Sequence, residues 1–479
     1  MDSLGVFASV LPEIILTVSG LALLMAAAFS GDRIAGLVSW LSVAALVVAG
    51  LALAHPAVHA GGEIFDGLYR ADAFSAFAKA MIFGAAAVSI VVAPRFFERQ
   101  GGLRGEYPVL IVFSSIGMAM MVSATDLLTL YVGLELQSLA AYVLASFMRR
   151  DVRSAEAGLK YFVLGALASG ILLYGMSLLY GFAGSTSFAG IAQAMGGEMS
   201  TGLMFGLVFV LAGLAFKISA VPFHMWTPDV YEGAPTPVTA FFASAPKVAA
   251  LALTTRVAIS AFGPGGIAWQ QIVIFLALAS IVLGAVAAIN QSNIKRLLAY
   301  SSINNVGFAL IGLAAGTAEG VAALMSYLFI YIVMTAGSFV CVLQMKDKDG
   351  NPVETIASLS GLSQTRPGLA AAFAIFMFSL AGIPPLFGFW AKFLVFDAAV
   401  GAGMTALAAI GIAASVIGAY YYLRVVKTIY FDPPAEGYAA ERSMVDYGII
   451  VVCAAVIVFG YLLNPALDQA SAAAAASLF

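Results

Sequence analysis

Charged residues are scarce in this sequence. Lysine and arginine number 22 and aspartate and glutamate 25 among 479 residues, so only 10% of the chain is charged. Soluble domains carry about 25% charged residues, because a surface that faces water needs them. The two signs nearly balance, with a formal net charge of −3, so no basic surface is available for nucleic acid. The composition therefore excludes a soluble protein and a nucleic-acid-binding protein.

Cysteine is scarce as well. Cys341 and Cys453 are the two cysteines, and they lie far apart in separate apolar runs without a Cys-x-x-Cys motif. We therefore expect no zinc, haem or iron–sulfur site. The sequence also lacks a Gly-x-Gly-x-x-Gly turn after a strand and a Gly-Lys-Ser/Thr phosphate loop. Any redox or nucleotide chemistry connected with this chain is expected to take place in a partner.

Hydrophobic residues, in contrast, make up 62% of the chain. This supply allows about fourteen membrane-spanning helices at roughly 20 residues each. The sequence therefore predicts an all-α polytopic membrane protein. The predicted spans are 6–28, 34–54, 73–93, 107–123, 127–147, 157–182, 203–227, 236–262, 269–289, 297–315, 320–343, 368–399, 404–426 and 444–463.

The cations between these spans alternate from side to side. One set of loops carries 14 cations, while the opposite loops hold only Arg70. Short loops rich in lysine and arginine stay cytoplasmic, so both termini are expected on the outer side. The 14 are Arg33, Arg95, Arg99, Arg104, Arg149, Arg150, Arg153, Lys295, Arg296, Lys346, Lys348, Arg366, Lys427 and Arg442.

A faint internal repeat divides the chain. Residues 160–164 resemble 326–330, and 221–223 resemble 383–385, at offsets of 166 and 162 residues. Five predicted spans lie in each interval, and an odd number of spans reverses direction in the membrane. We therefore predict two inverted five-helix repeats. The predicted parts are 1–106 (flanking helices), 107–262 (first bundle), 269–430 (second bundle) and 444–479 (C-terminal helix and tail).

Three cations within the spans lie toward span ends, namely Lys79, Arg256 and Arg424. A long side chain at such a position can extend to the membrane surface. We expect these three to do so.

Four further lysines lie within apolar stretches, where an ionised lysine costs at least about 2.5–3.5 kcal/mol. They are Lys160, Lys217, Lys247 and Lys392. Together they indicate a polar, hydrated interior. Glu135 is the only acid well inside a span, and a nearby ammonium would favour its charged form. Lys217 or Lys160 is its natural partner, either as a static ion pair between helices or as a pair that tunes proton affinity.

Two predicted spans are expected to be broken. Pro222 follows Lys217 by five residues, and a Gly-Ile-Pro-Pro motif at 382–385 interrupts the twelfth span. Proline frees carbonyls that only protein or water can satisfy at this depth, so each break is a place to admit water. His224 lies at the first break. It either passes protons between Lys217 and Lys247 or is merely bonded to a freed carbonyl.

Four segments resemble the antiporter-like membrane subunits of respiratory complex I, in the same order and over nearly the whole chain. They are Leu-Glu-Leu-Gln-Ser-Leu around Glu135, the run from Lys217 to Trp226, Gly-Ala-Pro-Thr-Pro-Val at 233–238 ahead of Lys247, and Asn-Ile-Lys-Arg-Leu-Leu-Ala-Tyr-Ser-Ser at 293–302. In that family, two inverted five-helix bundles carry half-channels for protons.

The resemblance implies a role for each interior residue. Glu135 and Lys217 would form a glutamate–lysine pair. Lys247 would be the central relay, and Lys392 the terminal residue of the proton path. Supporting roles would belong to Lys160, which is expected near the pair, and to His224 and Lys295.

The resemblance also implies a branch of the family. A terminal lysine at 392 favours the N-type subunit over the M-type, which is expected to carry glutamate there. The chain ends soon after the fourteenth span in an Ala/Ser tail, whereas the L-type has a long lateral helix. The alternative is the D-type subunit of a multisubunit sodium/proton antiporter, which has similar length and motifs.

An N-type subunit would translocate protons without redox chemistry of its own, as part of the enzyme NADH:quinone oxidoreductase. NADH, FMN, iron–sulfur clusters and quinone would then belong to partner subunits. The expected partners are the adjacent M-type subunit, the small K, J and A subunits, and the lipid bilayer. The expected location is the bacterial cytoplasmic membrane.

Overall fold

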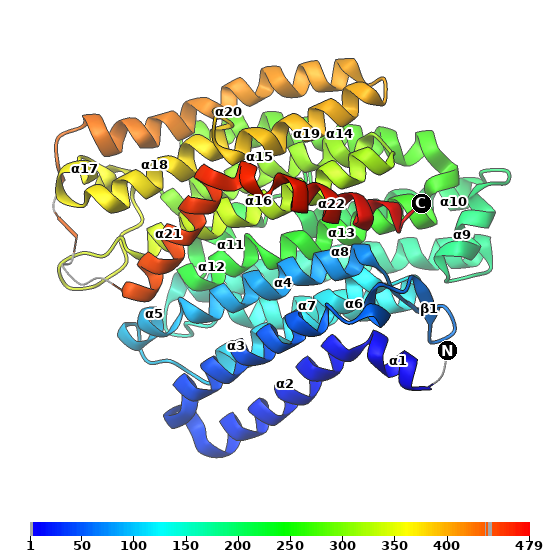
Figure 1. The fold of residues 1–479 in the computed structure, drawn as a ribbon, viewed down its shortest axis with the longest axis horizontal. Helices are drawn as coiled ribbons and strands as arrows, with labels where there is room; N and C mark the ends of the chain where they lie inside the picture. Colours follow the sequence, from blue (N-terminus) through cyan, green and yellow to red (C-terminus); the bar gives the residue numbers. More distant parts are fainter. Residues whose placement is uncertain (1–2, 436, 439–442) are drawn as a thin grey trace.

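Long apolar helices run along one common direction through the computed structural model, which describes residues 3–435, 437–438 and 443–479 (Figure 1). Within these residues, 12 helical segments are long and apolar enough to cross a membrane. The uninterrupted helices are α2 (Leu11–Ser30), α3 (Ala35–Ala52), α4 (Ala73–Val91), α6 (Glu106–Ser123), α7 (Leu127–Ala145), α8 (Val152–Ala183), α14 (Gly266–Ile289), α15 (Ile294–Ala314), α16 (Ala318–Leu343) and α20 (Thr405–Phe431).

Other crossings are interrupted. The first set is α10 (Thr201–Ile218) followed, after a turn, by α11 (Thr227–Gly233). The second is α12 (Thr236–Phe242), α13 (Ala245–Arg256) and the π-helix η3 (Val257–Ala261). The others are α18 (Pro367–Ala381) with α19 (Phe387–Gly401), and α21 (Met444–Phe459) with η6 (Gly460–Leu463) and α22 (Asn464–Ala476). The segment from α2 to α3 folds back on itself and so makes two crossings (Figure 1). Together, α18 and α19 supply another. The 14 predicted spans therefore all correspond to crossings.

Short elements lie at the two ends of the bundle. They are α1 (Ser3–Ser9), α5 (Pro94–Arg99), α9 (Phe188–Met195), α17 (Leu362–Thr365), the 3-10 turns η1 (Gly31–Ile34), η2 (Pro56–His59), η4 (Gly263–Gly265) and η5 (Ile356–Leu359), and the strands β1 (Gly62–Ile64) and β2 (Tyr69–Ala71). The two strands pair antiparallel as a small hairpin between α3 and α4.

Polar side chains fix where several spans begin. Asp126 and Asp151 accept hydrogen bonds from backbone N–H groups in the first turns of α7 and α8. Asn293 and Thr317 do the same for α15 and α16. The first N–H groups of a helix have no partner within the helix, so such caps stabilise its start.

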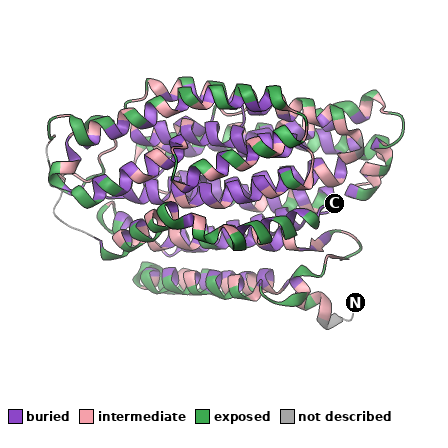
Figure 2. Cartoon of the chain, turned by 45° about the horizontal axis from the view of Figure 1, so that its top comes forward, coloured by how far each residue is buried: buried purple, intermediate pink, exposed green. Residues whose placement is uncertain are grey.

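The bundle has a buried core and an outer surface with many exposed residues (Figure 2). The segments Thr236–Ala261 and Ile294–Ala314 are each 94% buried over their most apolar window. Helices α2, α3, α8 and α20 instead carry large apolar side chains that point outward. Apolar outer faces on helices of this length fit a hydrocarbon environment.

The loops predicted to be cation-rich gather at one end of the bundle, on the left in Figure 1. The two termini lie at the opposite end, together with the β1–β2 hairpin that carries Arg70. Arg442, one of the 14 predicted loop cations, lies outside the described residues. The alternation of loops between two ends is therefore confirmed. Which end faces the cytoplasm stays a prediction.

Two broken crossings run in opposite directions. Helix α10 runs toward the cation-rich end and is interrupted before α11, whereas α18 runs away from that end and is interrupted before α19 (Figure 1). Helix pairing also repeats, since α6 packs along α7 as α14 packs along α15. These features fit the inverted architecture. The limits of the two bundles, 107–262 and 269–430, stay predictions.

The C-terminal tail differs from the expectation. The sequence predicts a span ending at 463 followed by a tail, but the chain continues as α22 (Asn464–Ala476) and packs against α4 and α16. Alanine has the highest helix propensity, so an alanine-rich segment beside two helices readily extends the last crossing.

Candidate functional site

Lys217 occupies the last turn of α10, just before the first helix break. Its side chain is 8% exposed. The ammonium Nζ donates to Ser138 Oγ at 2.7 Å and to Tyr142 OH at 3.5 Å, and both acceptors come from α7. The helix ends because Ser219 adopts a left-handed conformation, with φ of 63°. The break thus places Lys217 against a hydroxyl-lined face of α7.

Glu135 lies one turn before Ser138 on the same helix and is half-buried. Its Oε1 accepts a hydrogen bond from Ser169 of α8 at 2.5 Å. Among the described residues, no ion pair within 4.0 Å joins Glu135 to a lysine. Lys217 instead contacts Ser138, one helical turn from Glu135 on α7. Glu135 and Lys217 therefore lie near each other without direct contact.

Lys160 is not the alternative partner. Its ammonium pairs with Glu156 at 2.7 Å and with Asp229 at 2.8 Å, and its side chain is 41% exposed. The expectation of an interior position is therefore wrong for Lys160, while its placement near the pair stays a prediction. Helix α8 begins at Val152, so Lys160 lies only two turns from the cation-rich end of the bundle, where carboxylates are within reach.

Lys247, on α13, is 1% exposed. Its ammonium donates to the backbone carbonyl of Ile218, the last residue of α10, at 3.0 Å, and to the hydroxyl of Ser219. Thr227 in turn donates to Ser219 at 2.6 Å. Lys217 and Lys247 therefore both lie at the C-terminal end of α10, Lys217 in its last turn and Lys247 bonded to its last carbonyl. Carbonyls at a helix C-terminus carry partial negative charge, which suits an ammonium.

His224 lies in the turn between α10 and α11. A hydrogen bond with the backbone of Pro222 acts on its imidazole, and Nδ1 is buried without a partner among the described residues. Within the described residues, His224 makes no hydrogen bond to Lys217 or Lys247. Of the two alternatives, the geometry favours an imidazole bonded to a freed carbonyl.

Lys392 occupies the second break. Its side chain is 7% exposed, and Nζ donates to the carbonyl of Ala381, the last residue of α18, at 3.0 Å. It also donates to Ser415 of α20 at 3.1 Å and lies 4.6 Å from the ring centre of Phe308. Gly382, which follows α18 with φ of +83°, leaves room for this side chain.

The second half of the bundle also contains buried hydroxyl and amide groups that were not among the predicted site residues. Tyr331 donates to Ser302 at 2.8 Å, and Tyr327 donates to Asn305 at 2.6 Å. Asn305 donates to Tyr422 of α20 at 3.3 Å. These groups come from α15, α16 and α20, so a polar interior continues through the second half of the bundle.

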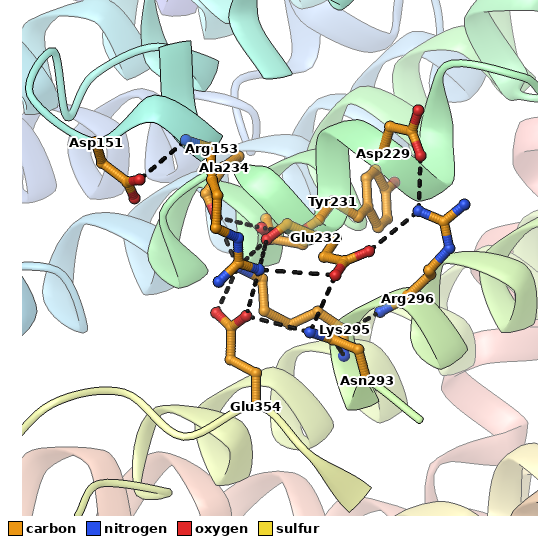
Figure 3. Close-up of polar contacts among 11 residues, drawn as sticks. Asp151, Arg153, Asp229, Tyr231, Glu232, Ala234, Asn293, Lys295, Arg296 and Glu354 are labelled. Atoms are coloured by element: carbon orange, nitrogen blue, oxygen red, sulfur yellow. Dashed lines mark hydrogen bonds and ion pairs between the residues drawn. The ribbon is translucent and has the colours of Figure 1, made fainter. Parts of the chain in front are cut away.

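Lys295 belongs to an ionic cluster built from charged side chains near helix ends and in one loop (Figure 3). We call it the end cluster; it consists of Arg153, Asp229, Glu232, Lys295, Arg296 and Glu354. Lys295 donates to Glu354 and to the carbonyls of Glu232 and Ala234, all within 2.9 Å. The end cluster ties α8, α11 and α15 to the loop that carries Glu354.

The electrostatics of Glu354 follow from this setting. Burial disfavours its charged form, but the cations Lys295 and Arg153 outweigh burial and hold the pKa of this carboxyl below its usual range. Glu354 is therefore ionised in the folded protein.

Two cations expected to reach the membrane surface are instead buried in ion pairs. Arg256 is fully buried and binds Asp72 through two bonds of 2.8 and 2.9 Å. Lys79 is also fully buried and pairs with Glu13 at 2.7 Å, while Tyr69 bridges the two. The expectation is wrong for both because acids near the ends of other helices reach them.

The third such cation, Arg424, lies near a helix end as expected. It donates to the carbonyl of Ile289, the last residue of α14, and to the carbonyl of Gln291, two residues further on. Cys341 is buried and Cys453 half-buried, and both are free thiols. The described residues contain no group of three or more His, Cys, Asp or Glu side chains that could hold a metal ion.

Comparison with known proteins identifies the fold and the family. Residues 124–418 match the family model of the NADH:quinone oxidoreductase/Mrp antiporter transmembrane region. The NADH-quinone oxidoreductase subunit N of Rhizorhabdus wittichii is 68% identical over the full length of both chains.

Solved structures agree. A chain of respiratory complex I from Thermus thermophilus with bound aureothin is 32% identical, with a TM-score of 0.82 over 96% of this chain and 99% of that chain. A chain of the Mrp complex from Dietzia is 23% identical with the same TM-score, over 98% of this chain and 97% of that chain, which shows the fold alone. The chain therefore belongs to the NADH:quinone oxidoreductase/Mrp antiporter transmembrane family and, within it, to the NADH-quinone oxidoreductase subunit N family.

Proposed function

We propose that this chain is the N-type membrane-arm subunit of a bacterial NADH:quinone oxidoreductase and that it translocates protons while partner subunits reduce quinone. The observation that carries the proposal is the row of three buried lysines at two helix breaks, in a chain that is 68% identical to a subunit N over its whole length. Buried lysines in membrane spans mark ion pathways, because they are too costly to retain without a use.

The alternative, a D-type sodium/proton antiporter subunit, has weaker support. The Mrp complex chain shares only 23% identity, which is evidence for a common fold. Identities of 68% and 62% over 98% or more of the chain are instead with subunit N proteins.

The first proposed step is charge stabilisation at the pair. Two opposite charges about 6 Å apart interact by about 3 kcal/mol at an effective dielectric constant of 20. A change of conformation or charge in a partner subunit that moves Glu135 relative to Lys217 would therefore alter how firmly Lys217 holds its proton. Lysine suits this role because its protonation responds to burial, whereas arginine stays charged.

Transfer onward would involve Lys247 as the central relay and Lys392 as the terminal residue. Lys247 shares the end of α10 with Lys217, so a change at one lysine is felt by the other. The buried hydroxyls and amide of α15, α16 and α20 provide hydrogen-bonding groups toward Lys392. Lys392 would then exchange a proton with the outer side of the membrane.

The remaining parts of the proposal concern the assembly. In this proposal the chain has no redox centre of its own, and NADH, FMN, iron–sulfur clusters and quinone bind to partner subunits. Its neighbours would be an M-type subunit and the small K, J and A subunits. The cation-rich end would face the cytoplasm, with both termini on the outer side of the bacterial cytoplasmic membrane.

The test places Glu135→Gln and, separately, Lys217→Ala in the assembled enzyme and follows NADH oxidation together with proton translocation. A positioned proton-transfer group contributes about 10²–10⁴-fold, so we expect either variant to reduce coupled turnover by on the order of tenfold or more. Glu156→Gln is the matched control, because Glu156 is an exposed acid at the end of the bundle.

If Lys217→Ala fails to assemble, Ser138→Ala removes the 2.7 Å acceptor of Lys217 and leaves the lysine in place. Unchanged activity and proton yield in Glu135→Gln and Ser138→Ala would refute the role of the pair.

A further inference from the structure

A cavity of about 520 Å³ lies at the cation-rich end, between the start of α6, the end of α7 and the start of α8. Sites for small ligands commonly measure about 300–1,000 Å³. The cavity lies where these three spans end, so it sits at the level of the membrane surface. It is separate from the cavity at the end cluster, which is lined by Arg153, Asp229, Glu232 and Arg296, among others. The two cavities have no lining residue in common.

The walls of this cavity are apolar and open to the outside. Val143 of α7 and Leu159 and Phe162 of α8 line it and are 50–63% exposed. The same helix surfaces continue away from the cavity with further exposed apolar residues, such as Leu139 and Leu167. Such a surface suits an acyl chain lying along α7 and α8.

The mouth of the cavity carries a net positive charge. Arg104 precedes α6 and Arg149 follows α7, and both line the cavity together with one acid, Glu106. Arg104 has no hydrogen-bond or ion-pair partner for its guanidinium within the described part of the chain. Arg149 reaches Glu106 only at 3.7 Å, with both side chains more than half exposed, which is longer than a good hydrogen bond.

We propose that this cavity binds an anionic phospholipid, with the phosphate on Arg104 and Arg149 and an acyl chain along α7 and α8. Guanidinium groups bind phosphate through two parallel hydrogen bonds, which makes arginine well suited to this contact. Basic pockets between membrane helices are known as sites for anionic headgroups. A free phosphate ion would use the arginines but not the apolar walls, so the structure favours the lipid.

The floor of the cavity gives this lipid a connection to the interior. Tyr142 lines the cavity and also accepts a hydrogen bond from Lys217 at 3.5 Å. A bound lipid would therefore cover the outer side of the tyrosine that contacts Lys217. Binding itself does not depend on the proposed proton path, so the two proposals can fail independently.

The experiment measures lipid retention in the assembled enzyme. The wild-type enzyme and the double variant Arg104→Ala/Arg149→Ala are delipidated, incubated with phosphatidylcholine vesicles containing phosphatidylglycerol, and examined by native mass spectrometry. We expect the double variant to bind phosphatidylglycerol on the order of tenfold more weakly, because two cations at a membrane surface are removed. Phosphatidylcholine binding should change little.

Two matched variants complete the design. Arg150→Ala removes a neighbouring arginine that does not line the cavity, and it should bind like the wild type. Val143→Trp keeps all the charges but narrows the cavity, and it should also weaken phosphatidylglycerol binding.

A photocrosslinking residue at position 159 identifies the occupant directly. A phospholipid adduct supports the proposal. An adduct with a neighbouring subunit, or equal lipid retention in the double variant and in Arg150→Ala, would overturn it.

Discussion

Lys295 illustrates how the surroundings of a residue decide its role. Its three ammonium hydrogens go to two backbone carbonyls and to Glu354, and a lysine has three donors in all. It is 1% exposed and held from three sides. Lys295 therefore acts as a structural tie between α11, α15 and a loop.

Glu354 gives this tie a pH dependence. Its folded-state pKa is depressed, so the stabilisation is complete above the usual glutamate pKa of about 4.3 and is lost as the pH falls through the lower folded-state pKa. We expect hydrogen exchange of segment 346–356, corrected for intrinsic rates, to speed up in acid.

In Glu354→Gln, the same exchange should already be fast at neutral pH and gain little more in acid. Glu63→Gln, on β1 at the other end, is the control and should behave like the wild type. Slow exchange in Glu354→Gln at neutral pH would contradict the role of the end cluster.

At the residue scale, the sequence predicts which lysines are interior better than it predicts their partners. Lys217, Lys247 and Lys392 are all at most 8% exposed, as apolar flanking sequence suggests. Their acceptors could not be predicted, because hydroxyls and carbonyls come from distant helices. The run Ser-Ser-Ile-Asn-Asn at 301–305 is a signal that was available, since amides are unusual within an apolar span.

At the scale of elements, the second helix break depends on Gly382. A Cβ added there would meet Lys392 Cδ at 2.9 Å, and φ is +83°. The left-handed conformation costs a residue with a Cβ roughly 1–2 kcal/mol. We expect Gly382→Ala to displace Lys392 and reduce proton translocation several-fold, measured in vesicles containing the assembled enzyme.

Gly401 offers the matched control, because it ends α19 with nothing within 4 Å of an added Cβ. Gly401→Ala should translocate protons normally. If both variants behave alike, the fit between the break and Lys392 is not important for function.

The ends of helices were predictable wherever an apolar run is followed or preceded by polar loop residues. Helix α15 begins one residue after Asn293 and α16 one residue after Thr317, within a few residues of the predicted limits. The tail was not predictable in this way. Helix α22 depends on packing against α4 and α16, and an alanine-rich sequence alone gives little hydrophobic signal for a crossing.

At the scale of the whole molecule, a buried ion pair joins the N-terminal helices to the first bundle. Asp72 caps α4, and Arg256 ends α13. Removing one partner of a buried pair costs about 3–5 kcal/mol, because the other charge stays buried. We expect Asp72→Asn, which keeps the cap, to lower the thermal stability of the purified enzyme strongly.

Replacing both partners, as in Asp72→Ala with Arg256→Met, should restore part of that stability. Lys427→Met breaks an exposed pair with Asp432 and should cost at most about 1 kcal/mol. Equal losses in Asp72→Asn and Lys427→Met would contradict a special contribution from burial.

The orientation of the molecule is a separate prediction. In right-side-out membrane vesicles, a membrane-impermeant maleimide should label Phe479→Cys but not Asp349→Cys, which lies in a cation-rich loop. In inverted vesicles the pattern should be the opposite, with Asp349→Cys labelled and Phe479→Cys unlabelled. Variants are compared with the parent chain, in which Cys341 is buried and Cys453 half-buried. The opposite pattern would place the cation-rich end outside.

The contacts of the two downstream lysines have one more consequence. Lys247 and Lys392 each face a helix-end carbonyl, from Ile218 and Ala381, rather than a carboxylate. A carboxylate such as Glu135 can accept the proton of a neighbouring lysine and so neutralise both groups. An amide carbonyl has no such option at physiological pH, so it acts as a counter-charge that cannot be titrated. In the proposed path, a proton held by either lysine would leave only by way of another side chain or water, because the helix-end carbonyl cannot accept it.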